Sequence, residues 1–331
     1  GSAEVKLSGT SLAGIVSNDD VRVDEQKAKA SFDLPGVVQD ATVSVTDIAL
    51  AGDDAANYSV ADKASVDGCS IKPATLTFSC SPLTKDYDGS PDVALEGFSL
   101  TGVFPGDAVS ADLSNAKASF ASRDVAQDAT VEVTGLALAG KDAANYTMPS
   151  TASVEHCSIK PKELAFSCGP LTKEYDGSEL VTLKGSSLKG IVSNDDVRVD
   201  EQNARARFDL PGVVQDATVE VSDLALAGDD AGNYSLEPAA SVAGCSIEPK
   251  GLSLDPSSLS KTYDKTTDAG LSEAVLAGVV DGDEVSVDVS KAKGSFDASR
   301  ASDSATVTVE GLALSGASAG NYSIADPLTV E

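Results

Sequence analysis

Lysines, aspartates and asparagines recur along this chain at a fixed spacing that could support covalent chemistry. The lysines and aspartates belong to a Lys-x-Tyr-Asp motif, and each asparagine precedes a tyrosine. A buried lysine beside an asparagine can condense with it and release ammonia if a protonated carboxylic acid lies between them, because burial lowers the pKa of lysine and raises that of a carboxyl group. The candidate isopeptide pairs are Lys85 with Asn145, Lys173 with Asn233 and Lys261 with Asn321, with Asp88, Asp176 and Asp264 as the acids.

A structural role for the same motifs is the favoured interpretation. In Lys-x-Tyr-Asp the tyrosine is expected in the core and the aspartate at the start of a turn, in which a following glycine supplies unusual dihedral angles. Asn-Tyr fits a turn entering a strand, because asparagine tolerates left-handed backbone and the tyrosine then begins the core. The residues assigned to this scaffold are Tyr87, Asp88, Tyr175, Asp176, Tyr263, Asp264, Asn57 and Tyr58.

Five cysteines form a second candidate for covalent chemistry. Cys69, Cys157 and Cys245 are 88 residues apart, and so are Cys80 and Cys168. Pairing Cys69 with Cys80 and Cys157 with Cys168 would join residues that an extended strand separates by roughly 35 Å, whereas disulfide Cα atoms lie about 4.4–6.8 Å apart. We therefore expect disulfides 80–157 and 168–245, with Cys69 left unpaired by truncation. On the loop-entropy model each would stabilise its repeat by roughly 4.5 kcal/mol.

Catalytic and metal-binding residues are scarce. The single histidine, His156, stands where Gly68 and Gly244 stand in the sister repeats, and no nucleophile elbow or phosphate-binding loop is present. An enzyme is therefore not expected. No cofactor is expected either; calcium is a weak alternative at two acidic turns, which carry Asp53, Asp54, Asp229 and Asp230.

The 88-residue spacing defines four tandem repeats. We place repeat 1 at residues 1–73, truncated at its N-terminus, and repeats 2, 3 and 4 at 74–161, 162–249 and 250–331. The opening Gly-Ser resembles a cloning scar, so the chain is expected to be a piece of a longer protein. Apolar residues alternate within each repeat, as in TVEVTGLALAG (130–140), and turn signals separate these segments.

This pattern predicts an all-β fold of antiparallel β-sandwiches of immunoglobulin-like size; a β-grasp sheet is the alternative, but the helix it requires is not evident. One proline separates consecutive repeats, which predicts an elongated rod. The net charge of −28, from 52 acidic and 24 basic residues, disfavours nucleic acid and membrane insertion as partners. A monomeric rod is expected, and the periodic cysteines favour an extracellular location.

The motifs KDYDGS, KEYDGS and KTYDKT, with LAGDDAANYS, LAGKDAANYT, LAGDDAGNYS and LSGASAGNYS, resemble the YDG-type repeat domains of bacterial surface proteins and adhesins, to which MBG-type repeats are related. The resemblance covers essentially the whole chain, which departs from the common pattern in its paired cysteines. It implies a non-catalytic stalk that projects a binding region from the cell surface, or a secreted equivalent. In the alternative, the repeats themselves bind a host glycan or surface protein, and Phe98 and Phe104 of repeat 2 are the weak candidates for that contact.

Overall fold

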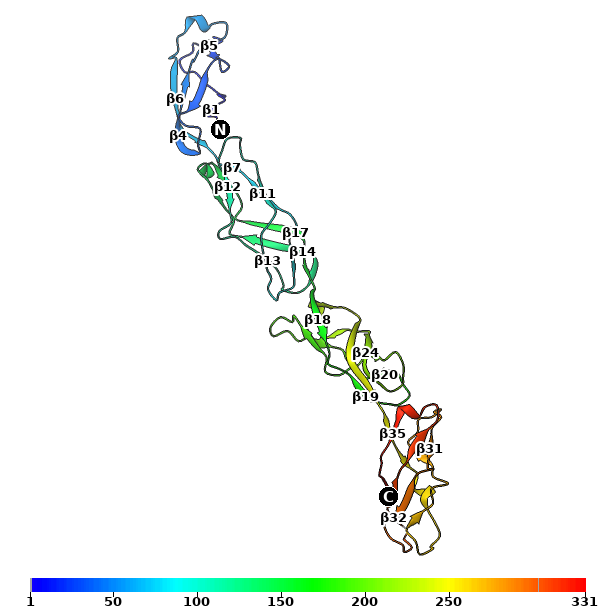
Figure 1. Ribbon diagram of the computed structural model, residues 1–331. Helices are drawn as coiled ribbons and strands as arrows, with labels where there is room; N and C mark the ends of the chain where they lie inside the picture. Colours follow the sequence, from blue (N-terminus) through cyan, green and yellow to red (C-terminus); the bar gives the residue numbers. More distant parts are fainter. Residues whose placement is uncertain (1, 303) are drawn as a thin grey trace. The chain divides into compact units, whose positions relative to one another are not determined.

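The computed structural model describes residues 2–302 and 304–331, and it consists of short β-strands and single turns of 3₁₀ helix (Figure 1). Contacts divide the chain into two compact units, which meet in sequence between Lys160 and Pro161. The first unit contains repeats 1 and 2, and the second contains repeats 3 and 4. The all-β class is confirmed, since the described helices are 3₁₀ turns of only three or four residues.

Repeat 1 has a four-stranded sheet in the order β1-β3-β4-β6 and a small ladder β2-β5. Its elements are β1 (Glu4–Val5), β2 (Arg22–Val23), β3 (Lys29–Phe32), β4 (Val38–Thr46), β5 (Leu50–Ala51), η1 (Ala55–Asn57) and β6 (Lys63–Ile71).

Repeat 2 has a five-stranded sheet, β10-β13-β14-β17-β9, and three two-stranded ladders, β11-β8, β12-β15 and β16-β7. Its elements are β7 (Ala74–Thr75), β8 (Thr77–Cys80), β9 (Thr84–Asp86), β10 (Asp92–Val93), β11 (Phe98–Thr101), β12 (Ser110–Asp112), β13 (Lys117–Phe120), β14 (Ala126–Thr134), β15 (Ala137–Ala139), η2 (Ala143–Asn145), β16 (Tyr146–Thr147) and β17 (Thr151–Lys160).

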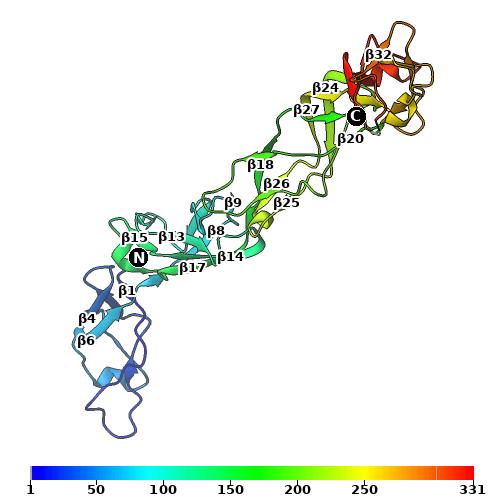
Figure 2. The same ribbon diagram turned by 90° about the horizontal axis from the view of Figure 1, so that it is seen from below.

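Repeat 3 repeats this plan with the five-stranded sheet β19-β27-β24-β23-β20, the sheet β21-β18-β26 and the ladder β22-β25; Figure 2 shows β20, β24 and β27. Its elements are β18 (Lys162–Ser167), β19 (Thr172–Glu174), β20 (Leu180–Val181), β21 (Ser187–Lys189), β22 (Arg198–Val199), β23 (Arg205–Arg207), β24 (Val214–Ser222), β25 (Leu226–Ala227), η3 (Ala231–Asn233), β26 (Tyr234–Leu236) and β27 (Ala240–Glu248).

Repeat 4 has the sheets β29-β32-β33-β36 and β30-β28-β35 and the ladder β31-β34. Its elements are β28 (Lys250–Leu254), η4 (Pro256–Leu259), β29 (Asp268–Ala269), β30 (Leu276–Ala277), β31 (Ser286–Asp288), β32 (Lys293–Phe296), β33 (Val307–Glu310), β34 (Ala313–Ser315), η5 (Ala319–Asn321), β35 (Tyr322–Ile324) and β36 (Leu328–Val330).

Alternation of apolar and polar residues explains the longest strands. In β24 the side chains of Val219 and Val221 are at most 1% exposed, while Glu220 between them faces solvent. Such a period of two places one face of a strand in the core and the other in water. The predicted β-sandwich architecture is confirmed. The described residues form six, eleven, ten and nine strands in repeats 1 to 4.

The first and last segments of a repeat pair in parallel, which the sequence did not predict. In repeat 3, β18 runs parallel to β26 and β19 runs parallel to the end of β27. Repeat 2 has the equivalent pairs β7 with β16 and β9 with β17. The chain therefore crosses from one sheet to the other between β18 and β19, and its last strand β27 is flanked by β24 and β19.

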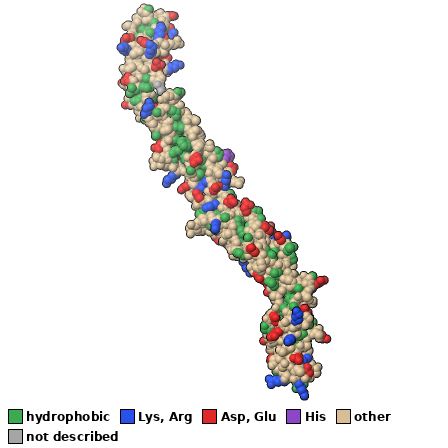
Figure 3. Space-filling model, in the orientation of Figure 1, with side chains coloured by type: hydrophobic (Ala, Val, Ile, Leu, Met, Phe, Trp, Pro, Cys, Tyr) green, Lys and Arg blue, Asp and Glu red, His purple; other side chains and the backbone are tan. Residues whose placement is uncertain are grey.

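Charged side chains of both signs are interspersed along the face shown in Figure 3. None of the helices in the described residues is long and apolar enough to cross a membrane.

Candidate functional site at the junction of repeats 3 and 4

The Lys-x-Tyr-Asp motif forms a turn that its own lysine closes. The Lys173 ammonium donates to Asp176 Oδ1 at 2.5 Å and to the backbone oxygens of Ser178 and Leu180 at 2.9 and 2.7 Å. The lysine side chain is only 11% exposed. Lys85 and Lys261 make the same set of contacts in repeats 2 and 4. This lysine therefore organises the turn.

The aspartate of this motif is held ionised. In repeat 4 the backbone amide of Thr266, followed by the Lys261 ammonium, lowers the pKa of Asp264 to about 2. A carboxylate that accepts such bonds favours its charged form. A protonated acid, which an isopeptide mechanism would require, is the opposite of what this geometry favours.

Glycine follows the aspartate because the turn needs left-handed backbone. Gly177 has φ +77° and Gly89 has φ +81°. Lys265 replaces this glycine in repeat 4 and still adopts φ +69°. The turn is therefore retained in repeat 4, at the cost of placing a side chain in a conformation that L-residues adopt only with strain.

The tyrosine of the Asn-Tyr motif is held by two hydrogen bonds to its hydroxyl group. Tyr322 donates its phenol proton to Asp283 Oδ2 and accepts from the Val280 amide at 2.9 Å. Burial, followed by the hydrogen bond to Asp283, raises the pKa of Tyr322 to about 12. Tyr58, Tyr146 and Tyr234 bind their own aspartates in the same way, at 2.6 Å.

These two motifs meet across the junction between repeats 3 and 4. Tyr175 of repeat 3 donates to Asp283 Oδ2 of repeat 4 at 2.9 Å. Its ring packs edge-on against Tyr322, with the centroids 5.4 Å apart and an interplanar angle of 77°, a favourable geometry for aromatic pairs. Asp283 thus accepts from two tyrosines, and the bond from Tyr322 is the main cause of its lowered pKa.

A second contact lies beside the first. The Val213 amide of repeat 3 donates to Asn321 Oδ1 of repeat 4 at 3.0 Å. Two glycines allow this close approach. A Cβ on Gly177 would lie 3.0 Å from Val280 Cγ1, and a Cβ on Gly212 would lie 3.3 Å from Asn321 Oδ1. Because both distances are tighter than ordinary van der Waals contact, the junction depends on the absence of side chains at these positions.

The junction also has an apolar component. One core cluster contains Leu171 and Tyr175 of repeat 3 together with Leu252 and Tyr322 of repeat 4. Burying apolar side chains in a shared cluster couples the two repeats by the same hydrophobic effect that stabilises each core.

Part of this arrangement recurs in the first compact unit. The Val37 amide of repeat 1 donates to Asn145 Oδ1 of repeat 2 at 2.9 Å, and a Cβ on Gly36 would lie 3.3 Å from the same oxygen. The asparagine of Asn-Tyr therefore binds the preceding repeat in both units.

The structure does not bring together the residues of the proposed isopeptides. Within a repeat, the lysine strand pairs with the end of the last strand, as β19 does with Ile247 of β27. The asparagine instead lies just before the strand that pairs with the first strand of the repeat, as Asn233 lies before β26, the partner of β18. A nine- or ten-residue strand spans about 30 Å, so the intended partners lie at opposite ends of the repeat. These pairs are Lys85 with Asn145, Lys173 with Asn233 and Lys261 with Asn321.

The burial expected for the motif tyrosines is correct for Tyr87 and Tyr175, which are 1% and 5% exposed. It is wrong for Tyr263, which is 59% exposed. Asn57 of repeat 1 is also exposed, and Tyr58 beside it is half-buried. The burial of Tyr175 depends on repeat 4, and an isolated motif cannot reveal such a contribution.

The structure holds all five cysteines as free thiols. Burial, followed by the nearby Cys157 thiol, raises the pKa of Cys80. Cys168 packs against the core cluster that contains Cys245. Cys69 instead packs in the core of repeat 1, against the cluster of Ala30 and Phe32.

The acidic turns suggested for calcium use part of their carboxylates internally. Asp54 Oδ2 accepts from the Asp20 amide at 3.0 Å, and Asp230 Oδ2 accepts from the Asp196 amide at 2.9 Å. Over residues 2–302 and 304–331, no group of three or more histidine, cysteine or acidic side chains is placed to hold a metal ion.

The fold and this junction define a class of protein: tandem all-β repeats, of which repeat 3 docks its Lys-x-Tyr-Asp turn on the Asn-Tyr end of repeat 4. A family model for the YDG domain matches residues 1–66, 72–153, 160–242 and 248–329. The chain therefore belongs to the YDG domain family, and the resemblance noted from its motifs is confirmed. Comparison with curated proteins gives no match.

Proposed function

We propose that these repeats form a non-catalytic stalk of a bacterial cell-surface adhesin, which holds a binding region away from the cell. The observation that carries the proposal is the junction of Tyr175, Asp283 and Asn321, since a spacer needs fixed angles between its repeats. Short junctions with direct contacts give a stiffer spacer than flexible linkers. The strongly acidic composition supports solubility of an exposed chain.

Small-angle X-ray scattering of the full chain tests this proposal. Four sandwiches of roughly 35–40 Å each would give a maximum dimension of about 150 Å. Tyr175→Ala should broaden the distance distribution by loosening one junction, whereas Tyr263→Ala, at the equivalent exposed position, should leave it unchanged. A compact wild-type particle, or equal effects of the two substitutions, would contradict a stalk built on this junction.

Disulfides 80–157 and 168–245 are the second part of the proposal. The grouping of Cys80 near Cys157 and the packing of Cys168 against the cluster of Cys245 support them. Each would join the first strand region of a repeat to its last strand, in an oxidising extracellular environment.

Peptide mapping without reduction, on protein expressed in an oxidising compartment, tests the pairing. We expect cross-linked peptides containing Cys80 with Cys157 and Cys168 with Cys245, and Cys69 as a free thiol. Links from Cys69 to Cys80 and from Cys157 to Cys168 would refute the intra-repeat clamp. Intact mass on the same sample also tests the isopeptides, through the loss of ammonia that each would cause.

A direct binding role is a second candidate because repeat 2 exposes two phenylalanines. Phe98 and Phe104 are 42% and 54% exposed, and repeat 3 has Ser186 and Val192 at these positions. Phe98 stacks on Phe78, with the ring centroids 5.9 Å apart. Exposed aromatic side chains are favourable contacts for glycans and proteins.

A glycan and protein array tests this second candidate. The matched variant carries Phe98→Ser and Phe104→Val, which are the residues that repeat 3 tolerates. Specific signal that disappears in this variant would support binding by repeat 2, and the absence of specific signal from the wild-type chain would exclude it for the ligands on the array.

A further inference from the structure

Repeat 2 has an open strand edge along β11. This strand pairs antiparallel with β8, with Ser99 opposite Ser79 and Leu100 opposite Phe78. No other strand pairs with β11 in the described part of the chain. The backbone groups on its outer side are therefore available to a partner strand.

The hydrogen bonds of the ladder show which backbone groups point outward. The Ser81 amide donates to the Gly97 oxygen at 3.1 Å, and hydrogen-bonded pairs alternate with non-hydrogen-bonded pairs along an antiparallel ladder. The backbone of Ser99 therefore bonds to β8. The amides and carbonyls of Phe98 and Leu100 point away from β8.

Repeats 1 and 3 cap the outward amide at the position of Phe98 with a carboxylate. In repeat 3 the Ser186 amide donates to Glu201 Oε1 at 2.8 Å, and its hydroxyl donates to the same oxygen at 2.5 Å. The equivalent threonine and glutamate of repeat 1 form these two bonds at 3.0 and 2.8 Å. Repeat 2 instead has Phe98 with Leu113, and leucine has no hydrogen-bond acceptor. No side chain among the described residues accepts from the Phe98 amide.

The side chains along this edge are apolar. Phe98 is 42% exposed and stacks on Phe78, with an interplanar angle of 14°. Leu100 lies on the same face of β11 as Phe98, because alternate side chains of a strand share a face. No charged residue occurs in residues 97–106. Natural strand edges are commonly protected by a lysine, as β21 of repeat 3 is by the exposed Lys189.

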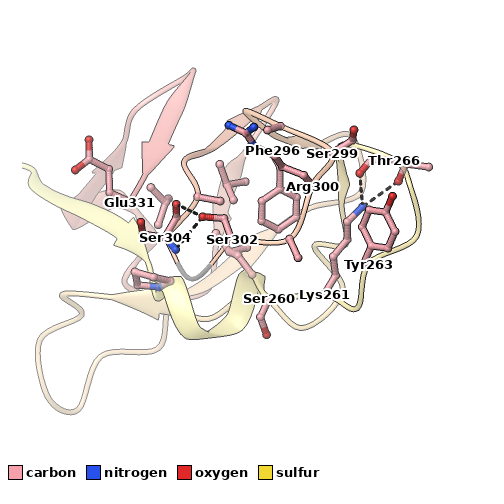
Figure 4. A pocket seen from close by; sticks show the side chains of 17 residues that line it. Ser260, Lys261, Tyr263, Thr266, Phe296, Ser299, Arg300, Ser302, Ser304 and Glu331 are labelled. Carbon is pink, nitrogen blue, oxygen red and sulfur yellow. Dashed lines mark hydrogen bonds between the residues drawn. The ribbon is translucent and has the colours of Figure 1, made fainter.

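Tyr263 of repeat 4 is also exposed, but its surroundings are charged. In Figure 4 it lies beside Lys261 in a cavity of about 500 Å³. The Lys261 ammonium lies 5.5 Å from the centroid of the Phe296 ring. The edge of β11 carries no such charge, so it favours a partner surface that is itself apolar and uncharged.

We propose that β11 pairs with β11 of a second copy of this chain, in an antiparallel ladder centred on Ser99. In this register Phe98 of each copy lies opposite Leu100 of the other, and these two pairs exchange four backbone hydrogen bonds. Ser99 then faces its counterpart in a non-hydrogen-bonded pair, as its bonds to β8 require. The outward backbone groups and the apolar faces therefore match in one arrangement, which is a self-complementary contact of two-fold symmetry.

The charge of the chain favours this edge for contact between two copies. Chains of net charge −28 repel each other, so they approach most readily where neither carries a charge. Two short strands bury less area than a stable dimer requires, so the association should be weak and concentration-dependent. It goes beyond the proposed stalk role and does not depend on it, although tethering chains side by side would raise their effective concentration.

A cross-link at the two-fold axis is the first test. In a non-hydrogen-bonded antiparallel pair the Cα atoms lie about 4.5 Å apart, which is within the range of about 4.4–6.8 Å for disulfides. Ser99→Cys should therefore link two chains under mild oxidation, and peptide mapping without reduction should find the substituted residue joined to its counterpart. Ser187→Cys, at the equivalent position of the capped edge in repeat 3, is the matched control. Equal cross-linking of the two variants would overturn the proposal.

Sedimentation equilibrium of the unaltered chain measures the association directly, at an ionic strength of about 0.15 M to screen the repulsion between chains. We expect the average mass to rise towards that of a dimer with increasing concentration. Phe98→Ser combined with Leu113→Glu installs the cap of repeat 3 and should weaken the dimer by at least about tenfold. Both residues occur at the equivalent positions of repeat 3, so repeat 2 should retain its fold. A wild-type chain that stays monomeric up to about 0.5 mM, or a dimer that the cap leaves unchanged, would refute the pairing.

Discussion

The phenol of Tyr175 donates a hydrogen bond to the carboxylate of Asp283 at 2.9 Å, although the two residues belong to different repeats and are 108 positions apart. The same carboxylate accepts from Tyr322 of its own repeat. Asp283 therefore links the Asn-Tyr motif of repeat 4, through Tyr322, to the Lys-x-Tyr-Asp turn of repeat 3, through Tyr175. Loss of either phenol should affect both repeats.

Tyr175→Phe removes one hydrogen bond and keeps the ring contact with Tyr322. We expect a loss of about 1 kcal/mol in the stability of the junction, because a typical hydrogen bond contributes that much. Hydrogen exchange should become faster at the Val213 and Val280 amides. Tyr263→Phe is the matched control, since that phenol is exposed, and the prediction is wrong if the two variants behave alike.

Gly177→Lys introduces into repeat 3 the residue that repeat 4 carries at this position. Its Cβ would lie 3.0 Å from Val280 Cγ1, so the repeats must move apart, at a cost of roughly 1–3 kcal/mol. Differential scanning calorimetry of the full chain should show an earlier transition.

The reverse substitution in repeat 4, Lys265→Gly, supplies the control. It removes a side chain from left-handed backbone at φ +69° and should stabilise repeat 4 by about 1 kcal/mol. An unchanged thermogram for Gly177→Lys would show that the close approach of Gly177 and Val280 does not determine the junction.

Asn321→Ala removes the oxygen that accepts from the Val213 amide. We expect the Val213 amide to lose its protection against exchange and the junction to lose about 1 kcal/mol. Asn57→Ala, at the exposed position of the same motif in repeat 1, should have no effect on Val213. If Val213 remained protected in Asn321→Ala, its amide would have to find another acceptor and the assigned contact would be wrong.

His156 should make the stability of repeat 2 depend on pH. The Nδ1–H of protonated His156 donates to Asp128 Oδ1 at 2.5 Å, and this hydrogen bond raises the pKa of His156 above its ordinary value of 6.5. Because the folded pKa is higher than the unfolded one, the contribution to stability is fully present below pH 6.5 and is lost as the pH rises through the raised value. A proton NMR titration of the imidazole measures this directly.

Asp128→Asn is the control for this titration, since it should return the pKa of His156 towards 6.5. His156→Gly places at φ +60° the residue found in repeats 1 and 3, and it should abolish the pH dependence. A titration of His156 that is identical in the wild type and in Asp128→Asn would eliminate the carboxylate as the cause.

The architecture could be predicted from the sequence because the same motifs recur every 88 residues. The 88-residue spacing of the four Asn-Tyr motifs predicted the number of repeats. Alternation of apolar and polar residues, as in Val219–Glu220–Val221, predicted strands with one buried face. The glycine of Tyr-Asp-Gly predicted a turn with unusual dihedral angles, and Gly177 has φ +77°. Each of these features is local, so it is encoded within one repeat.

The junction could not be predicted in the same way. A fixed period of 88 residues does not distinguish a contact of Tyr175 with its own repeat from a contact with the next one, since both partners recur at the same interval. The motif of repeat 4 likewise gave no sign that Tyr263 would be exposed, because the residues that bury Tyr175 come from β27 and from the following repeat. The burial of a motif tyrosine therefore depends on residues outside the motif.

The parallel pairing of β19 with β27 has a consequence for tension along the chain. These strands lie near the two ends of repeat 3, and each is connected through its outer end to the rest of the polypeptide. A pull on the two termini would drive neighbouring parallel strands past each other, so their hydrogen bonds would be loaded together in shear and could not open one at a time. The rate of forced unfolding is governed by the barrier to that step, and this topology should make the barrier high when the two ends of the repeat are pulled apart.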